Sequence, residues 1–225
     1  MTVEKFHIAF DIELDKTLDF EYPYISPEQK DYWLNKAQDR FVKQRAFGNN
    51  LFRTTFEETE KRIDDLRTIV KKQQVGPSLS GQIYTSQLPS DYLYLVRHQC
   101  TTSSPLCGIK VVGGLQVKND DINNRKKNPF EKPTNEEPLY YIEGNNIIYE
   151  MVDDSFTITN TNITYIKKPT PITNGTEYIV PEAVSQCELP EHTHNEILDI
   201  AISMVLENIE SQRYQTNANE LTKTE

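Results

Sequence analysis

The stretch LYYIEGNNIIYE, residues 139–150, decides the fold class of this chain of 225 residues. Aromatic and β-branched residues recur in two short runs, and Gly144-Asn145 separates the runs. Such runs are typical of strands, and Gly accepts the positive φ that a tight hairpin turn requires. The stretch therefore predicts antiparallel β structure in the middle of the chain.

The β region continues on both sides of this hairpin, because an apolar period of two begins at Gln82. We expect strands at 82–85, 91–98, 108–117, 139–143, 146–151, 155–159, 162–167 and 176–180. Asn160-Thr161 and Asn174-Gly175 are further expected hairpin turns. Short strands with polar turns are typical of a small antiparallel sandwich or barrel.

A long polar gap, residues 118–138, separates two of these strands and is rich in Asn, Lys and Pro. Loops of this length are usually functional or disordered. Two interpretations stay open: a flexible surface loop, or an inter-subunit arm that orders on a neighbouring copy. The candidate arm residues are Arg125, Lys126, Lys127, Asn128, Pro129 and Phe130.

Helix signals precede the β region. Ser26, Pro27 and Gln29 form a capping box with proline in the first turn, and Gly48 is placed to end the helix after Phe47. We expect a core side of Trp33, Leu34, Ala37 and Phe41, and a solvated or interface side of Lys30, Asp31, Asp39, Arg40 and Lys43. Residues 2–16 fit both a strand and a helix, and the Glu, Lys and Ala between their apolar positions favour a helix.

A second capping box, Thr55 with Glu58, predicts another helix. Its apolar stripe is Ile63, Leu66 and Val70. We expect Lys71 and Lys72 in its last turn, where cations suit the helix dipole, and its end at 76–78.

The last helix is expected from His192 to Arg213, with Thr193 and Glu196 as a third capping box. Its wide apolar arc is Ile197, Leu198, Ile200, Ala201, Met204, Val205 and Ile209. Such an arc needs cover on two sides, so the helices at the two ends of the chain must pack together. The predicted fold is α+β: a helical bundle of 1–78 and 188–225, with an antiparallel β-sandwich or small barrel, 79–187, inserted.

Composition excludes several classes of function. The net charge is −10, which leaves no excess of cations for general nucleic-acid binding. No run approaches 18 apolar residues, and the acids within the first 15 residues interrupt any signal-peptide core. We expect a soluble protein that is cytoplasmic at synthesis and does not contact a membrane.

Side chains for catalysis are scattered. Cys187, His192 and His194 are the best candidates for a metal site, but His-x-His at a helix start directs two rings apart and no second cysteine completes a tetrahedron. No nucleophile, base and orienting group recur in a known spacing, and Gly113-Gly114 is too little for a phosphate loop. We predict no enzyme activity, no metal and no cofactor.

Four stretches carry a resemblance to a known family. They are DYWLNKAQDRFVKQR (31–45), FEETEKRIDDLRTIV (56–70), YIKKP (165–169) and CELPEHTHNEILDIAISMVLENIESQRYQ (187–215). In this order they resemble ring proteins of crAss-like tailed phages of Bacteroidales, in particular the head–tail connector, or adaptor, under the portal.

The resemblance implies a structural virion protein at the portal–tail junction, assembled in the host cytoplasm. Its partners would be the portal protein, neighbouring copies in a homododecamer, and further tail or ring proteins, with DNA only passing through the channel during ejection. The last helix and the tail would reach the portal. The implied portal-interface residues are Glu196, Asp199, Met204, Arg213, Tyr214 and Gln215.

An alternative function is a carbohydrate- or protein-binding β-sandwich module associated with the phage tail. Such a module needs an exposed aromatic platform, for which Tyr140, Tyr141 and Tyr149 are the candidates. Alternating Tyr residues in strands are more often packed in a core. The exposure of these three rings therefore separates the two functions.

Overall fold

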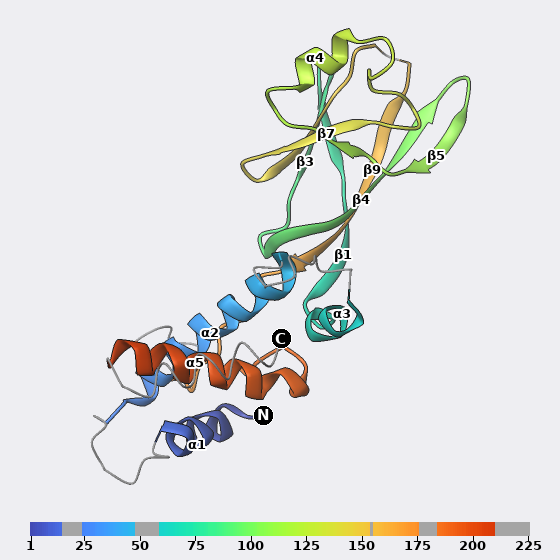
Figure 1. Cartoon of the computed structure of the whole chain (residues 1–225). Helices are drawn as coiled ribbons and strands as arrows, with labels where there is room; N and C mark the ends of the chain where they lie inside the picture. Colours follow the sequence, from blue (N-terminus) through green and yellow to red (C-terminus); the bar gives the residue numbers. More distant parts are fainter. Residues whose placement is uncertain (15–23, 48–58, 154, 176–183, 210–225) are drawn as a thin grey trace. The chain divides into compact units, whose positions relative to one another are not determined.

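The computed structural model describes residues 1–14, 24–47, 59–153, 155–175 and 184–209. The chain divides into two compact units: a helical unit, Met1–Ile69 with Pro169–Glu225, and a β unit, Val70–Lys168 (Figure 1). The β unit is thus inserted in the sequence of the helical unit. Together they form the predicted α+β fold. In the sequence, the boundaries between the units lie at 69/70 and 168/169, whereas the expected boundaries were 78/79 and 187/188.

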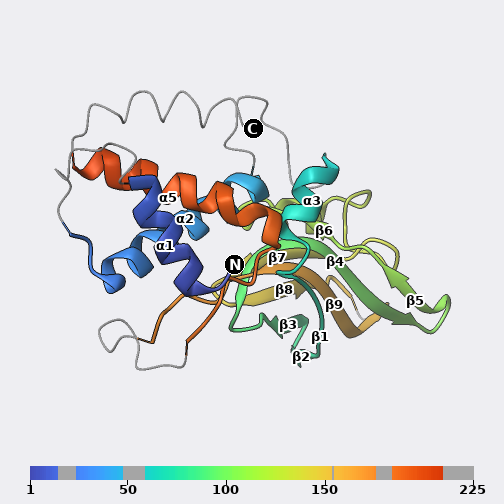
Figure 2. The same ribbon diagram turned by 90° about the horizontal axis from the view of Figure 1, so that it is seen from below.

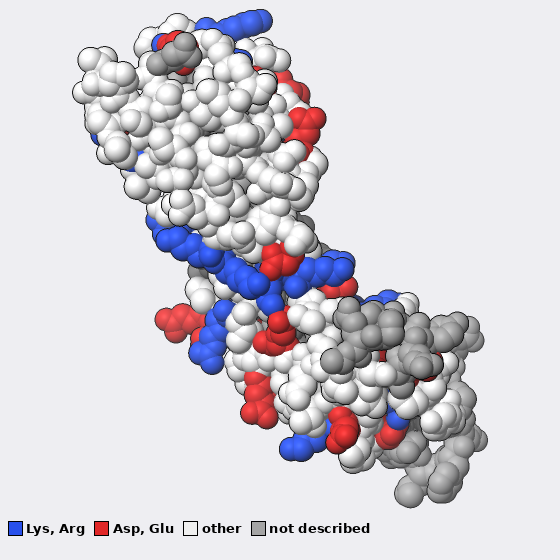
Figure 3. All heavy atoms as spheres, turned by 180° about the vertical axis from the view of Figure 1, so that it is seen from behind, with Lys and Arg blue, Asp and Glu red and all other residues white. Residues whose placement is uncertain are grey.

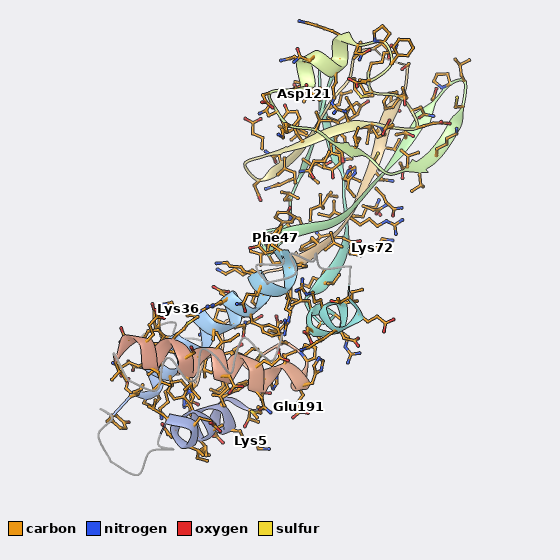
Figure 4. All side chains as sticks on the ribbon, viewed as in Figure 1. Lys5, Lys36, Phe47, Lys72, Asp121 and Glu191 are labelled. Carbon is orange, nitrogen blue, oxygen red and sulfur yellow. The ribbon has the colours of Figure 1, made fainter. Side chains whose placement is uncertain are left out.

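Helices α1 (Val3–Leu14), α2 (Pro27–Phe47), α3 (Glu60–Leu66) and α5 (His194–Asn208) form the helical unit, together with a 3-10 turn, η2 (Glu191–Thr193). Helix α5 contacts both α1 and α2, so its wide apolar arc is covered on two sides as predicted (Figure 2). The side chains between these helices form the core, and each large one buried contributes about 1.5–3 kcal/mol (Figure 4). The core includes Phe6, Phe10, Leu34, Phe41, Ile197, Ala201 and Leu206.

Helix α1 confirms the helical interpretation of residues 2–16. Phe6, Phe10 and Leu14 are buried at a spacing of four, whereas Ile8 and Ile12 are exposed. A strand would have placed all five on one face, so the burial pattern follows the helical period.

Helix α2 begins with the predicted capping box. The backbone N–H of Ser26 donates to Gln29 Oε1 at 3.0 Å, and the N–H of Gln29 donates to Ser26 Oγ at 3.3 Å. One prediction for this helix is wrong: Lys30 and Asp31, assigned to the solvated side, are buried. Both are paired with charged or ionisable side chains of α1, which offsets the cost of removing them from water.

Helix α3 is shorter than predicted. It ends at Leu66, and Val70, Lys71 and Lys72 lie in a strand, β1 (Val70–Val75), instead of in a last helical turn. The reason is tertiary, because β1 pairs along its whole length with β9, from Val70–Ile166 to Val75–Thr161. The predicted cap at Thr55 and Glu58 lies outside the described residues.

The β unit has two sheets with strand orders β1-β9-β4-β5 and β2-β3-β8-β7-β6. The further strands are β2 (Pro77–Ser80), β3 (Ile83–Gln87), β4 (Tyr92–Ser104), β5 (Gly108–Val112), β6 (Leu115–Gln116), β7 (Leu139–Glu143), β8 (Asn146–Glu150) and β9 (Thr157–Lys167). Neighbours are antiparallel except β6 and β7. One core with residues from both sheets, including Cys100, Ile147, Tyr149, Ile163 and Tyr165, lies between them.

The turn predictions have different outcomes. Gly144-Asn145 joins β7 to β8 as predicted, with Gly144 at φ +57°. Asn160-Thr161 is not a turn, because β9 is one continuous strand with an irregularity where its pairing with β4 passes from Asn160 to Ile158. The polar residues there mark a bulge rather than a hairpin. The strand expected at 176–180 lies outside the described residues.

Candidate interaction surfaces

Helix α2 has a row of buried polar side chains, and each has a partner. Asp31 lies 2.7 Å from His7 Nε2 and also accepts the N–H of Asn174 at 2.9 Å. Lys30 Nζ lies 2.7 Å from Asp11. These pairs join α2 to α1 and to the chain that returns from the β unit, so they orient the elements of the helical unit.

The other end of α2 contributes Arg45, which is buried among carboxylates. Its Nε lies 2.9 Å from Oδ2 of Asp65, a fully buried residue of α3, and its guanidinium also donates to Glu196 of α5. The second oxygen of Asp65 lies 2.9 Å from His192 Nε2. One buried cation therefore joins three helices of the helical unit.

The predicted portal-interface residues have different environments in this unit. Glu196 is partly exposed and pairs within its own chain, with Arg45 and with Lys61 at 3.2 Å. Asp199 is exposed, whereas Met204 is 8% exposed and belongs to the core between the helices. The remaining predicted residues, Arg213, Tyr214 and Gln215, lie outside the described residues.

The predicted arm is an ordered segment on its own sheet. Helix α4 (Ile122–Lys127) follows Asp121, which Figure 4 labels. Ile122 is buried with Val117, Leu139 and Tyr141 on the face of the five-stranded sheet that points away from the core shared by the two sheets. The segment expected to be a surface loop or an inter-subunit arm therefore contains a short helix, α4, that packs on the sheet of its own chain.

Two basic residues of this segment are paired with carboxylates of the same chain. Arg125 Nε lies 2.9 Å from Asp121, and Lys126 Nζ lies 3.0 Å from Glu150 of β8. Lys127 and Pro129 are exposed, Asn128 is half-buried, and the side chain of Phe130 is 97% exposed. Of the predicted arm residues, Phe130 thus presents a large apolar surface to solvent.

The aromatic platform expected of a glycan-binding module is absent at the three candidate positions. Tyr140, Tyr141 and Tyr149 are 5%, 7% and 0% exposed. Tyr140 and Tyr149 face the core between the sheets, and Tyr141 lies under α4 with its hydroxyl donating to Glu150 at 2.8 Å. The alternative function therefore loses the residues that favoured it.

A neutral hydrogen-bonded chain crosses the core of the β unit. The N–H of Gly114 donates to His98 Nδ1 at 3.3 Å, so Nε2 carries the proton and donates to the Tyr149 hydroxyl at 2.5 Å. Tyr149 in turn bonds Thr161 Oγ1 at 2.9 Å. Burial lowers the pKa of His98 to about 4, and burial raises the pKa of Tyr149 above its ordinary value. Both groups are therefore neutral near pH 7, and they link strands of the two sheets.

Sequence reasoning missed the role of Gly114. A Cβ at this position would lie 2.7 Å from the His98 ring and 2.8 Å from Cδ1 of Tyr140. The ring of His98 stacks on Tyr140 with centroids 4.1 Å apart. Gly114 is therefore required by the close approach of the backbone to this stack rather than by a phosphate.

The residues weighed as a metal site do not converge. His192 bonds Asp65, and Nε2 of His194 donates to the Leu189 carbonyl oxygen at 2.9 Å. Burial raises the pKa of the Cys187 thiol, which disfavours the thiolate that a metal would require. Within the described ranges, no cluster of three or more His, Cys, Asp or Glu side chains is arranged to hold a metal ion. None of the described helices has the length and apolar character to cross a membrane.

Among the residues that the structure describes, the ionisable groups named above join helices or sheets instead of converging on a ligand. The chain belongs to the family described as phage tail ring protein 3/4, which it matches over residues 1–220. It is similar to Ring protein 4/5 of Bacteroides phage crAss001, with 26% identity over 223 residues that cover 91% of this chain and 92% of that protein. The family resemblance noted in the sequence is thereby confirmed, and the chain is a structural ring protein of the virion.

Proposed function

We propose that this chain is the protomer of a head–tail connector ring, which docks under the portal and extends the DNA channel toward the tail. The observation that carries the proposal is the ring-protein family match over residues 1–220, which includes both units. The similar phage protein is covered over 92% of its length, so the resemblance extends over nearly all of that chain as well. The proposed assembly takes place in the host cytoplasm.

The helical unit is the proposed portal-binding part. Helix α5 is held in place by its buried apolar arc and by the ion pair of Glu196 with Arg45, so its exposed side is a rigid surface. Asp199 lies on that side. We assign the portal contact to Asp199, with Glu196 at its margin, and to Arg213, Tyr214 and Gln215. Met204 supports α5 from inside.

The remaining proposed partners are those of a ring that forms part of the DNA channel. Neighbouring copies, in a ring of twelve, and further tail or ring proteins bury the protein surfaces, whereas DNA passes through without being held. The net charge of −10 supports this last point, because a protein without excess cations has little to gain from displacing counterions.

The test is the mass of the portal from the same genome with and without this protein. A mass increment of twelve copies of the 26.1 kDa chain is the expected result. If the protein assembles on another ring protein but never on the portal, its position in the virion lies farther along the tail than the connector. Absence of any complex would overturn the proposal.

A charge reversal maps the contact. Asp199→Arg, and separately deletion of 210–225, are expected to lower the affinity for the portal at least tenfold. Asp39→Arg is the matched control, because Asp39 is an exposed aspartate on α2 of the same unit. Equal portal binding by Asp199→Arg, the deletion and the control would move the contact away from α5.

A further inference from the structure

The two edges of the four-stranded sheet differ in chemistry. Edge strand β1 exposes Lys71, Lys72, Gln73 and Gln74. Lysines on an edge prevent a second chain from pairing with it. Edge strand β5 instead exposes Ile109 (74%) and Val111 (62%). Between them β5 also carries Lys110, whose Nζ lies 2.6 Å from Glu136. With Lys110 paired in this way, Ile109 and Val111 give β5 an apolar outward face that β1 does not have.

The β4–β5 hairpin presents this apolar edge in a fixed geometry. Ile109 and Val111 lie opposite Ser103 and Thr101 of β4, on the face away from the core that Cys100 and Val112 line. Leu106 in the connecting turn is 95% exposed. Figure 1 shows the hairpin projecting at the margin of the β unit, and Figure 3 shows that the face of this unit seen from behind is nearly free of charged side chains.

One edge strand of the five-stranded sheet carries no charged side chain. Strand β2 has the sequence PSLS, with Leu79 59% exposed, and Ile83 on the adjacent β3 is 40% exposed. The strands are both short, with four residues in β2 and five in β5. Proline at the start of β2 is compatible with an edge strand, because its missing N–H removes no ladder hydrogen bond at the first position of the strand.

These two edges lie on opposite sides of the β unit. Gly76 alone separates β1 from β2, and Gly113-Gly114 alone separates β5 from β6. The two sheets therefore run in the same order, with β1 and β2 at one side and β5 and β6 at the other. A contact between opposite sides of identical copies is head-to-tail. Repetition of such a contact gives a ring when the rotation between neighbours closes, and an open filament when it does not.

We propose that the ring contact between neighbouring copies is strand addition of β5, with Leu106, Ile109 and Val111, to the β2 edge of the next copy at Leu79 and Ile83. This inference rests on the proposed ring function and specifies its interface. The occupant is a second copy, because one chain carries both edges, each with exposed apolar side chains, on opposite sides. Pairing of β5 with the β5 strand of another copy would instead stop at a two-fold dimer.

Cysteine cross-linking tests the geometry. Ile109→Cys and Leu79→Cys are combined in a chain whose exposed Cys107 and half-buried Cys187 are replaced by Ser and Ala, and the portal complex is oxidised. The double variant is expected to give a ladder of covalent oligomers on a denaturing gel, and each single variant only monomer. Dimers from Ile109→Cys alone, or rings without a ladder, would overturn the inference.

A charge insertion gives an independent readout. Ile109→Lys with Val111→Lys is expected to reduce ring assembly at least tenfold without a change in melting temperature. Ile8→Lys with Ile12→Lys is the matched control, because these isoleucines of α1 are 60% and 61% exposed. Wild-type assembly by the β5 variant contradicts the proposed interface alone, whereas wild-type protein that never forms a ring contradicts the proposed function itself.

Discussion

The helical unit and the β unit contain different kinds of buried polar group. In the helical unit, Arg45 and Asp65 are charged and lie 2.9 Å apart. In the β unit, His98, Tyr149 and Thr161 form a neutral chain. A buried ion destabilises the fold when its partner is removed. A neutral hydrogen-bonded chain destabilises the fold when one of its members becomes charged. The two units should therefore respond to different perturbations.

Each unit has its own optical probe for this comparison. Trp33, the one tryptophan of the chain, lies on α2 and reports on the helical unit through its fluorescence. The buried Tyr140, Tyr149 and Tyr165 make the near-ultraviolet circular dichroism sensitive to the β unit. Unfolding followed by both signals separates the two units.

The largest expected effect is that of Asp65→Asn. The change leaves the buried guanidinium of Arg45 with Glu196 as its remaining carboxylate and removes the partner of His192. We expect the free energy of unfolding of the helical unit to fall by about 3–5 kcal/mol, measured by urea titration of Trp33 fluorescence. Asp64→Asn, at a side chain 64% exposed, is the control and should change it by less than about 0.5 kcal/mol. Equal effects of the two variants would contradict the role of the buried pair.

Acid should act on the β unit through His98. Burial lowers the pKa of His98 to about 4 in the folded unit, against its ordinary value of 6.5. Between these pH values the unfolded chain therefore binds the proton and the folded chain does not. The stability is fully present above pH 6.5 and is lost as the pH falls to 4, by about 3 kcal/mol.

The comparison variant for this prediction is His98→Gln, which is uncharged at every pH. Tyrosine circular dichroism at stepwise lower pH should show a smaller loss of stability between pH 6.5 and 4 in the variant than in the wild type. The same pH dependence in both proteins would show that other groups cause it.

The effect of Gly114→Ala should be smaller and confined to the β unit. The added methyl group would overlap the rings of His98 and Tyr140, and such overpacking typically costs about 1–3 kcal/mol. Gly113→Ala is the neighbouring control, since the nearest atom to its Cβ is 4.0 Å away. A melting temperature lowered as much by the control would attribute the effect to the loop backbone instead.

The smallest effect concerns the surface segment. Lys126→Gln removes the ion pair with Glu150, which is partly exposed, and we expect a loss of less than about 1 kcal/mol that disappears at high salt. Lys127→Gln changes an exposed lysine next to it and is expected to change nothing. A loss that persists at high salt would mean that Lys126 acts through packing of its stem rather than through charge.

Features with a local cause could be predicted from the sequence. The Ser26 capping box and the Gly144-Asn145 turn are set by a few neighbouring residues, and the structure has both. Strand β1 could not be predicted, because its conformation depends on pairing with β9, some ninety residues later. The apolar period of 63–70 favours a helix, because a local pattern carries no information about pairing with a distant strand.

The candidate surfaces show the same limit. Alternation in LYYIE indicates two faces of a strand, but it does not say that α4 covers the second face and buries Tyr141. The charges of Lys30 and Asp31 suggested solvent, while their partners Asp11 and His7 lie on another helix. The exposed Ile109 and Val111 lie within an expected strand, but only the sheet order identifies that strand as an edge.

The most direct test of the account is the mass of the purified portal from the same genome, measured by mass photometry alone and with this protein. A connector ring should give a single larger complex, heavier by twelve copies of the 26.1 kDa chain. A portal of unchanged mass beside free 26.1 kDa protein would contradict the connector function.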